Sequence, residues 1–188
     1  SVELLRRADL AMYRAKATRS GRAVFYNASM DEDREARMNM ANDLRRALDE
    51  QALTVVYQPV IDAHTRLICG VEALVRWNRK GHGQVPPDIF IPVAEDNGLI
   101  GRLGEFVMRR ALSEAAGWPM ISVAVNVSPL QLHDVSFVSS TAEILNAARF
   151  PAERVILELT EGFFVRNPDR AKQSMAELQR KGFRIALD

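Results

Sequence analysis

Four side chains with oxygen ligands lie at spacings that would bring them together in a folded chain. They are Glu72, Asn126, Glu158 and Asp188, which are 54, 32 and 30 positions apart. Carboxylate and carboxamide oxygens suit a hard cation such as Mg2+ or Mn2+ better than they suit zinc. Acids that converge repel one another unless a positive charge lies between them. The pattern therefore predicts a divalent-metal site. The alternative is that each acid pairs separately with a nearby Arg or Lys.

Three further polar side chains are candidates for the same site. Arg76 is two pleats beyond Glu72 on the same strand face, where its guanidinium could hold a phosphate oxygen. A role for Arg76 as counter-ion to one of the acids is an equal alternative. Gln58, in the preceding strand, could reach the same edge of the sheet. Glu161 follows the fourth strand and would be either an acid behind the metal ligands or a loop cap.

Apolar runs that alternate with helical stretches must position these residues. The first two runs are joined only by Asp62 to Arg66, too few residues for a crossover helix, so we expect an antiparallel hairpin. Helices separate the later runs, which predicts parallel strands in an α/β fold whose carboxyl edge carries the site. We expect strands at Leu53 to Ile61, Leu67 to Trp77, Ile121 to Val127, Val155 to Thr160 and Phe183 to Asp188. We expect helices at Pro87 to Asn97, Leu99 to Gly117, Leu130 to Ala148 and Pro168 to Lys181.

The first fifty residues have a different pattern. A short strand is expected at Ala23 to Tyr26, and a second helix, rich in charge, at about Asp31 to Glu50. That charge indicates either a solvated helix face or a connecting helix that transmits a signal between domains. A first helix is predicted by apolar residues at helical spacing, namely Leu4, Leu5, Ala8, Ala11, Met12 and Ala15.

Composition limits the classes of protein that the chain could be. Apolar residues make up 47% and charged residues 26% of the 188 positions, which excludes a disordered tail. A net charge of +1 offers no basic surface to a nucleic acid polymer. The single cysteine, Cys69, fits a reducing compartment and is expected to be a core thiol rather than a nucleophile. With no apolar run of about 20 residues and no signal peptide, we expect a cytoplasmic chain, although a longer parent protein could carry a membrane anchor elsewhere.

Several motifs in one order make the chain resemble a known family. Its larger part resembles the EAL domain of bacterial cyclic-di-GMP phosphodiesterases. Glu72-Ala73-Leu74 is the motif after which that domain is named. The start of the chain is similar to the closing helix and strand of a GGDEF (diguanylate cyclase) domain, on the run Ala8 to Lys16 and on Gly21-Arg22. The EAL motifs are Tyr57-Gln58-Pro59, Gly70 to Trp77, Pro86 to Glu95, Val125 to Ser128, Glu158 to Glu161 and Ala186 to Asp188.

This resemblance implies a fold and a reaction. The fold is a (β/α)8 TIM-type barrel with an antiparallel first strand, of which this chain holds about the first five strands. The reaction is the hydrolysis of cyclic di-GMP to linear pGpG with Mg2+ or Mn2+, a step of bacterial second-messenger signalling. The implied roles are metal ligation by Glu72, Asn126, Glu158 and Asp188, activation of the metal-bound water by Glu72, substrate contacts by Gln58, Leu74 and Arg76, and support of the ligands by Glu161.

The resemblance also divides the chain. We expect the tail of a GGDEF domain at residues 1–28, a linker helix at 29–50 and the N-terminal part of an EAL domain at 51–188. The family's second aspartate, catalytic lysine and last glutamate would follow Asp188. The 188 residues alone are therefore expected to be inactive and, with an unpaired strand edge, to self-associate as a homodimer or otherwise. For the intact domain the alternatives to an enzyme are a degenerate EAL domain that acts as a non-catalytic cyclic-di-GMP receptor, and a structural signalling scaffold.

Overall fold

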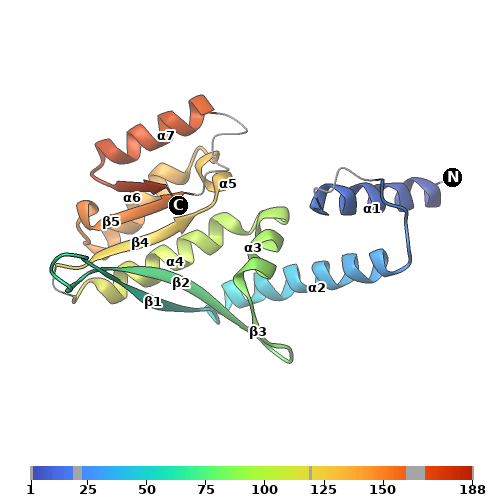
Figure 1. Ribbon diagram of the computed structural model, residues 1–188, viewed down its shortest axis with the longest axis horizontal. Coiled ribbons are helices and arrows are strands. Elements are labelled where there is room, and N and C mark those ends of the chain that lie inside the picture. The colour runs from blue at the N-terminus through green and yellow to red at the C-terminus, as the bar shows by residue number, and fades with distance from the viewer. Residues whose placement is uncertain (1, 19–22, 119, 160–167, 188) are drawn as a thin grey trace. The chain divides into compact units, whose positions relative to one another are not determined.

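A computed structural model describes residues 2–18, 23–118, 120–159 and 168–187. The chain divides into two compact units, Ser1–Asp43 and Leu44–Asp188. The helices are α1 (Val2–Thr18), α2 (Ser29–Asp49), α3 (Pro87–Asp96), α4 (Ile100–Ala115), α5 (Pro129–Leu132), α6 (Phe137–Ala148), the 3-10 turn η1 (Ala152–Arg154) and α7 (Pro168–Arg180) (Figure 1). The strands are β1 (Thr54–Ile61), β2 (Ile68–Arg79), β3 (Gly83–Val85), β4 (Ser122–Val127), β5 (Val155–Leu159) and β6 (Arg184–Leu187). In the part of the chain described, no helix has the length and apolar character needed to cross a membrane.

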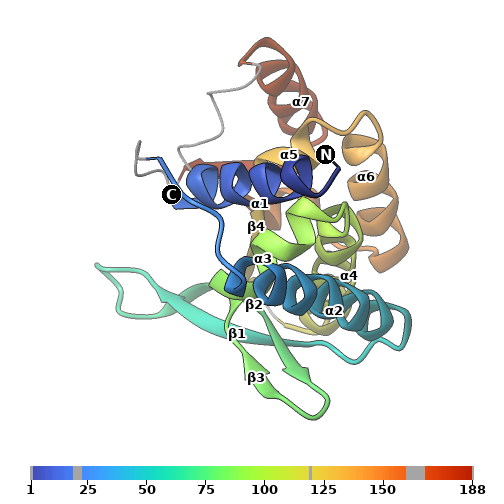
Figure 2. The same cartoon turned by 90° about the vertical axis from the view of Figure 1, so that its right-hand side faces the viewer.

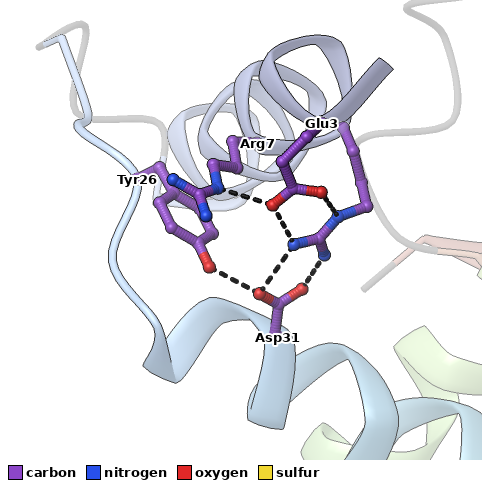
Figure 3. A network of polar contacts seen from close by, with 5 residues as sticks. Glu3, Arg7, Tyr26 and Asp31 are labelled. Atoms are coloured by element: carbon purple, nitrogen blue, oxygen red, sulfur yellow. Dashed lines mark hydrogen bonds and ion pairs between the residues drawn. The ribbon is translucent and has the colours of Figure 1, made fainter. Parts of the chain in front are cut away.

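In the first unit, charged side chains join α1 to the start of α2 (Figure 3). The Glu3 carboxylate accepts hydrogen bonds from Arg6 Nε at 2.9 Å and from Arg7 Nε at 2.6 Å. Arg6 also pairs with Asp31, which accepts a 2.6 Å hydrogen bond from the Tyr26 hydroxyl. The hydrogen bonds from Arg6 and then Arg7 lower the pKa of Glu3 to about 2. Those from Arg6 and then Tyr26 lower the pKa of Asp31.

The predictions for this unit are confirmed for the helices and wrong for the strand. Both expected helices form, and α2 begins two residues before the predicted start. Residues 23–27 form no strand. A strand is defined by main-chain hydrogen bonds to a neighbouring strand, and no described strand pairs with these residues.

The second unit is built on an open sheet of six strands. The strand order is β1-β2-β4-β5-β6, and β3 pairs with β2. The β1–β2 pair is antiparallel, whereas β2–β4, β4–β5 and β5–β6 are parallel. Figure 2 shows the β1–β2 and β2–β3 hairpins as projecting ends of this sheet. The predicted α/β fold with an antiparallel first strand is confirmed.

Helices α4, α6 and α7 contribute to a core on one face of the sheet. In β2, β4 and β5 every second side chain is aliphatic and enters this core, because side chains alternate between the two faces of a strand. Helix α4 faces them with apolar residues at helical spacing, of which Ala111 and Leu112 are fully buried. The strand residues of the core are Val71, Ala73, Val123, Val125, Val127, Val155, Leu157 and Leu159. The intervening side chains of these strands therefore lie on the opposite face.

One predicted helix is divided in two. The stretch from Leu130 to Ala148 was expected to be continuous, but α5 ends at Leu132 and α6 begins at Phe137. Between them Asp134 Oδ1 accepts hydrogen bonds from the main-chain N–H and the hydroxyl of Ser136 at 2.9 and 2.8 Å. Such local bonding offers the backbone an alternative to the helix and breaks the periodic pattern.

Two features of the β2 strand were not predicted correctly. Cys69 is exposed rather than a core thiol, and its Sγ lies 3.5 Å from the Val60 carbonyl oxygen. All residues from 63 to 69 are exposed, so burial along this strand begins only at Gly70. At its other end β2 extends to Arg79 and pairs with β3, a strand that the apolar pattern did not indicate.

Candidate active site

Three of the predicted metal ligands lie on the open face of neighbouring strands. Asn126 of β4 is directly opposite Glu158 of β5 in the parallel register. Glu72 of β2 is opposite Ala124, two residues before Asn126 on the same face of β4. The strand register therefore places the three side chains in one row across β2, β4 and β5.

The first two members of this row are in contact. Asn126 Nδ2 donates a hydrogen bond to Glu72 Oε1 at 2.6 Å, although 54 positions separate the residues in the sequence. Glu72 and Glu158 are half-buried and Asn126 is exposed. Two carboxylates flanking a carboxamide form a donor set that fits Mg2+ or Mn2+. Among the described residues, no three His, Cys, Asp or Glu side chains are grouped so that they could hold a metal ion.

Two of the predicted site residues lie outside the described residues. They are Asp188, expected as a fourth ligand, and Glu161, expected behind the ligands. Their roles stay predictions.

The substrate-side candidates lie on the same face. Gln58 of β1 is directly opposite Glu72 in the antiparallel pair, so the two side chains are cross-strand neighbours. Leu74 and Arg76 follow Glu72 at alternate positions, and both are half-buried. Arg76 Nη1 donates to the Val75 carbonyl oxygen at 2.9 Å. The structure gives this guanidinium no ion pair with an acid among the residues it describes.

The residue before Gln58 is directed to the opposite face. Tyr57 packs on the core, with its ring 4.9 Å from that of Trp118, and its hydroxyl donates a 2.7 Å hydrogen bond to Glu114. Burial, and after it the bond to Glu114, raises the pKa of Tyr57 above its usual range. The Tyr57-Gln58 pair thus anchors β1 on one face and presents an amide on the other.

Sequence reasoning missed a group of polar residues next to Asn126. Ser128 donates through its hydroxyl to Glu95 of α3 at 2.6 Å, and its main-chain N–H donates to the Gln131 side chain at 3.0 Å. Part of this group has a sequence signal, since Ser128 and Gln131 have the spacing of a capping box and Pro129 is at the first helical position. Glu95 ends the motif Pro86 to Glu95, but no spacing in the sequence indicates its contact with Ser128.

The sequence of the second unit identifies its family. Residues 41–188 match the family model described as EAL domain. The chain belongs to the EAL domain family. The family predicted from the motifs is thereby confirmed, whereas the GGDEF tail predicted for residues 1–28 stays a prediction.

Relatives align over nearly the whole chain. An "Uncharacterized signaling protein" of Caulobacter vibrioides is 41% identical over 186 residues, which are 98% of this chain and 23% of that protein. The "Bifunctional diguanylate cyclase/cyclic di-GMP phosphodiesterase MucR" of Pseudomonas aeruginosa is 34% identical over 191 residues, covering 99% of this chain and 28% of MucR. The chain spans about a quarter of the length of the curated relatives that it matches.

Solved structures of EAL domains have the same fold. The "PaMucR Phosphodiesterase, c-di-GMP complex" superimposes with a TM-score of 0.75 at 34% identity, over 80% of this chain and 63% of that one. The Xanthomonas citri FimX EAL domain, solved in complex with c-diGMP, has a TM-score of 0.73 at 22% identity, over 84% of this chain and 62% of that one. At that lower identity the second likeness concerns the fold alone.

Proposed function

We propose that this chain takes part in hydrolysing one phosphodiester bond of cyclic di-GMP to give linear pGpG, with Mg2+ or Mn2+ held on the open face of the sheet. The observation that carries the proposal is the row of Glu72, Asn126 and Glu158 across three neighbouring strands, with the first two in contact. The choice of substrate is supported by the 34% identity to MucR, named as a cyclic di-GMP phosphodiesterase.

The four ligand candidates would provide both negative charge and a neutral oxygen ligand. Glu72, Glu158 and Asp188 supply negative charge to attract the cation, and Asn126 adds an oxygen without adding further repulsion. A divalent cation bound there lowers the pKa of a water and stabilises charge on phosphoryl oxygens. Because Glu72, Asn126 and Glu158 lie on strands of one sheet, the backbone hydrogen bonds maintain the spacing of these three side chains.

The remaining residues of the open face would bind the dinucleotide. Arg76 donates one N–H to the Val75 carbonyl oxygen. Its guanidinium has further N–H donors that could bind the oxygens of a phosphate. Gln58 offers an amide beside Glu72, and Leu74 adds apolar surface between Glu72 and Arg76. This arrangement offers a cation to a phosphate and uncharged surface to other parts of the same substrate.

The division of the chain is part of the proposal. Residues 1–28 are the closing part of a GGDEF domain, 29–50 form a linker helix, and 51–188 begin the EAL domain. In support, the similarity to the bifunctional protein MucR covers 99% of this chain, which includes residues before position 41 where the EAL match begins.

The substitution Glu72→Gln in the full-length protein tests this function. It keeps the size of the side chain but removes a charge that the cation needs, so pGpG formation should fall on the order of 100-fold or more. Product is measured by chromatography at saturating Mn2+, and circular dichroism checks that the fold is kept. The matched control is Glu143→Gln, the same change at an exposed position of α6.

Two outcomes would contradict the proposal. Near-wild-type turnover of Glu72→Gln at saturating Mn2+ would exclude Glu72 as a required ligand. A wild-type protein that binds cyclic di-GMP without hydrolysing it would instead favour the receptor.

A further inference from the structure

All three polar groups of Ser128, which lies at the end of β4, are engaged, and together they make four hydrogen bonds. Its main-chain N–H donates to Gln131 Oε1 at 3.0 Å, and its carbonyl accepts from the Gln131 N–H at 3.0 Å. Its hydroxyl donates to Glu95 Oε1 at 2.6 Å and accepts from the Leu130 N–H at 3.2 Å. The loop that leaves β4 is therefore joined to α3 and α5 at one residue.

A fourth residue keeps Gln131 in place. Gln131 is one of two buried polar side chains among the described residues, at 5% exposure, and its amide lies against Gly104 of α4. A Cβ at Gly104 would lie 2.9 Å from Gln131 Cδ and closer still to its Nε2. The Gln131 amide would have to move, which would disturb its hydrogen bond with the Ser128 N–H. We call Glu95, Gly104, Ser128 and Gln131 the Ser128 network.

This network is more than a helix cap. The capping box of Ser128 and Gln131 already satisfies the start of α5, a helix of only four residues. The hydrogen bond from the Ser128 hydroxyl to the Glu95 carboxylate of α3 satisfies no main-chain group of α5, so it is not part of that cap. It does attach the end of β4 to α3, and charge-assisted bonds of this kind are shorter and stronger than neutral ones.

The network lies beside the row of ligands. Only Val127, itself buried at 4% exposure, separates Ser128 from Asn126. Val125 and Val127 point into the core, and the Asn126 side chain points to the open face, where it contacts Glu72. With the strand packed on one side and its end joined to α3, α4 and α5, the backbone at Asn126 has little freedom to turn its carboxamide away.

We propose that the Ser128 network positions Asn126 for the site on the open face, so that Glu95, Gly104, Ser128 and Gln131 are positioning residues for the metal. The inference rests on the proposed function. Removal of a partner that hydrogen-bonds a metal ligand directly lowers metal affinity by about 10- to 100-fold, and the Ser128 network, which acts on Asn126 through the backbone, is expected to have an effect at the lower end of that range.

The test compares two alanine substitutions one turn apart on α4. Gly104→Ala places a methyl group against Gln131, whereas Gly101→Ala meets nothing within 4 Å. Both changes replace a glycine of α4 by alanine, which favours the helix, so a loss seen only in Gly104→Ala reports the contact with Gln131. The readouts in the full-length protein are the NMR signals of the Asn126 side-chain amide, assigned with Asn126→Asp, and the affinity for Mn2+.

We expect the Asn126 amide signals to shift in Gly104→Ala and to match the wild type in Gly101→Ala. We also expect Mn2+ affinity to fall about tenfold in Gly104→Ala alone. Ser128→Ala removes the bond to Glu95 and the bond from the Leu130 N–H without adding volume, so it tests the network even where Gly104→Ala fails to fold. Its control is Ser139→Ala, at an exposed position of α6 where the hydroxyl donates to the Ser136 carbonyl.

The outcomes separate the inference from the proposed function. Asn126 signals that stay unchanged in both Gly104→Ala and Ser128→Ala would overturn the inference, whatever the activity of the wild type. If those signals move as expected but wild-type protein binds no Mn2+, the positioning of Asn126 stands and the proposed metal-dependent function fails.

Discussion

The two units of the chain are stabilised in different ways. In the first, Leu4 is 67% exposed and Phe25 87% exposed. An ion pair between Arg6 and Asp31 joins α1 to α2, and a second between Arg6 and Glu3 lies within α1. In the second, a continuous core lies between the sheet and its helices, and Leu112, one of its members, is fully buried.

This difference bears on where a precise site can be built. Exposed ion pairs contribute little to stability and are weakened by salt, whereas burial of apolar side chains is the main source of stability and tolerates few changes of volume. The row of Glu72, Asn126 and Glu158 lies on strands whose other face is that core. Its geometry is therefore maintained by packing that is less sensitive to salt than the ion pairs of the first unit.

The largest effect is expected from opening a cavity in the core. Leu112→Ala should lower the free energy of unfolding of the second unit by about 2–5 kcal/mol, because the side chain is removed from a fully packed site. Urea denaturation followed by tryptophan fluorescence measures this. The control Val135→Ala, at a position that is 82% exposed, should change the free energy by less than about 0.5 kcal/mol. Equal effects of the two variants would mean that the core does not stabilise this unit as described.

A smaller effect is expected from titrating the first unit. The pKa of Glu3 is lowered from 4.5 to about 2, mainly by its hydrogen bonds to Arg6 and then Arg7. A lowered pKa stabilises the folded contact above pH 4.5, and that stabilisation is lost as the pH falls through about 2. NMR of the Glu3 carboxyl carbon should give a midpoint near 2, which rises toward 4.5 in 1 M NaCl as the charges are screened. A midpoint of about 4.5 at low salt would contradict the ion pairs of Figure 3.

Much of the fold could be predicted because its signals are local. The alternation of apolar and polar side chains indicated strands β2, β4 and β5. The five-residue connection at Asp62 to Arg66 indicated the antiparallel hairpin of β1 and β2. The errors arose where a competing interaction is not visible as a pattern. The side chain of Asp134 interrupts a helical stretch, and β3 is too short to have a period.

The site could be predicted only in part for a similar reason. Strand alternation was enough to place Glu72, Asn126 and Glu158 on one face, but the contact between Glu72 and Asn126 depends on the register of two strands. The capping box at Ser128 could be recognised from its spacing, whereas its bond to Glu95 joins residues 33 positions apart through the packing of α3.

Binding of Mn2+ to the full-length protein is the most direct measurement of the central claim. Calorimetric titration of the wild type should show Mn2+ binding, and Glu72→Gln should weaken it by at least about tenfold while Glu143→Gln leaves it unchanged. The reason is that Glu72 lies in the row of ligands on the open face, and Glu143 is exposed on a helix. An affinity for Mn2+ that is the same in Glu72→Gln as in the wild type would contradict the account.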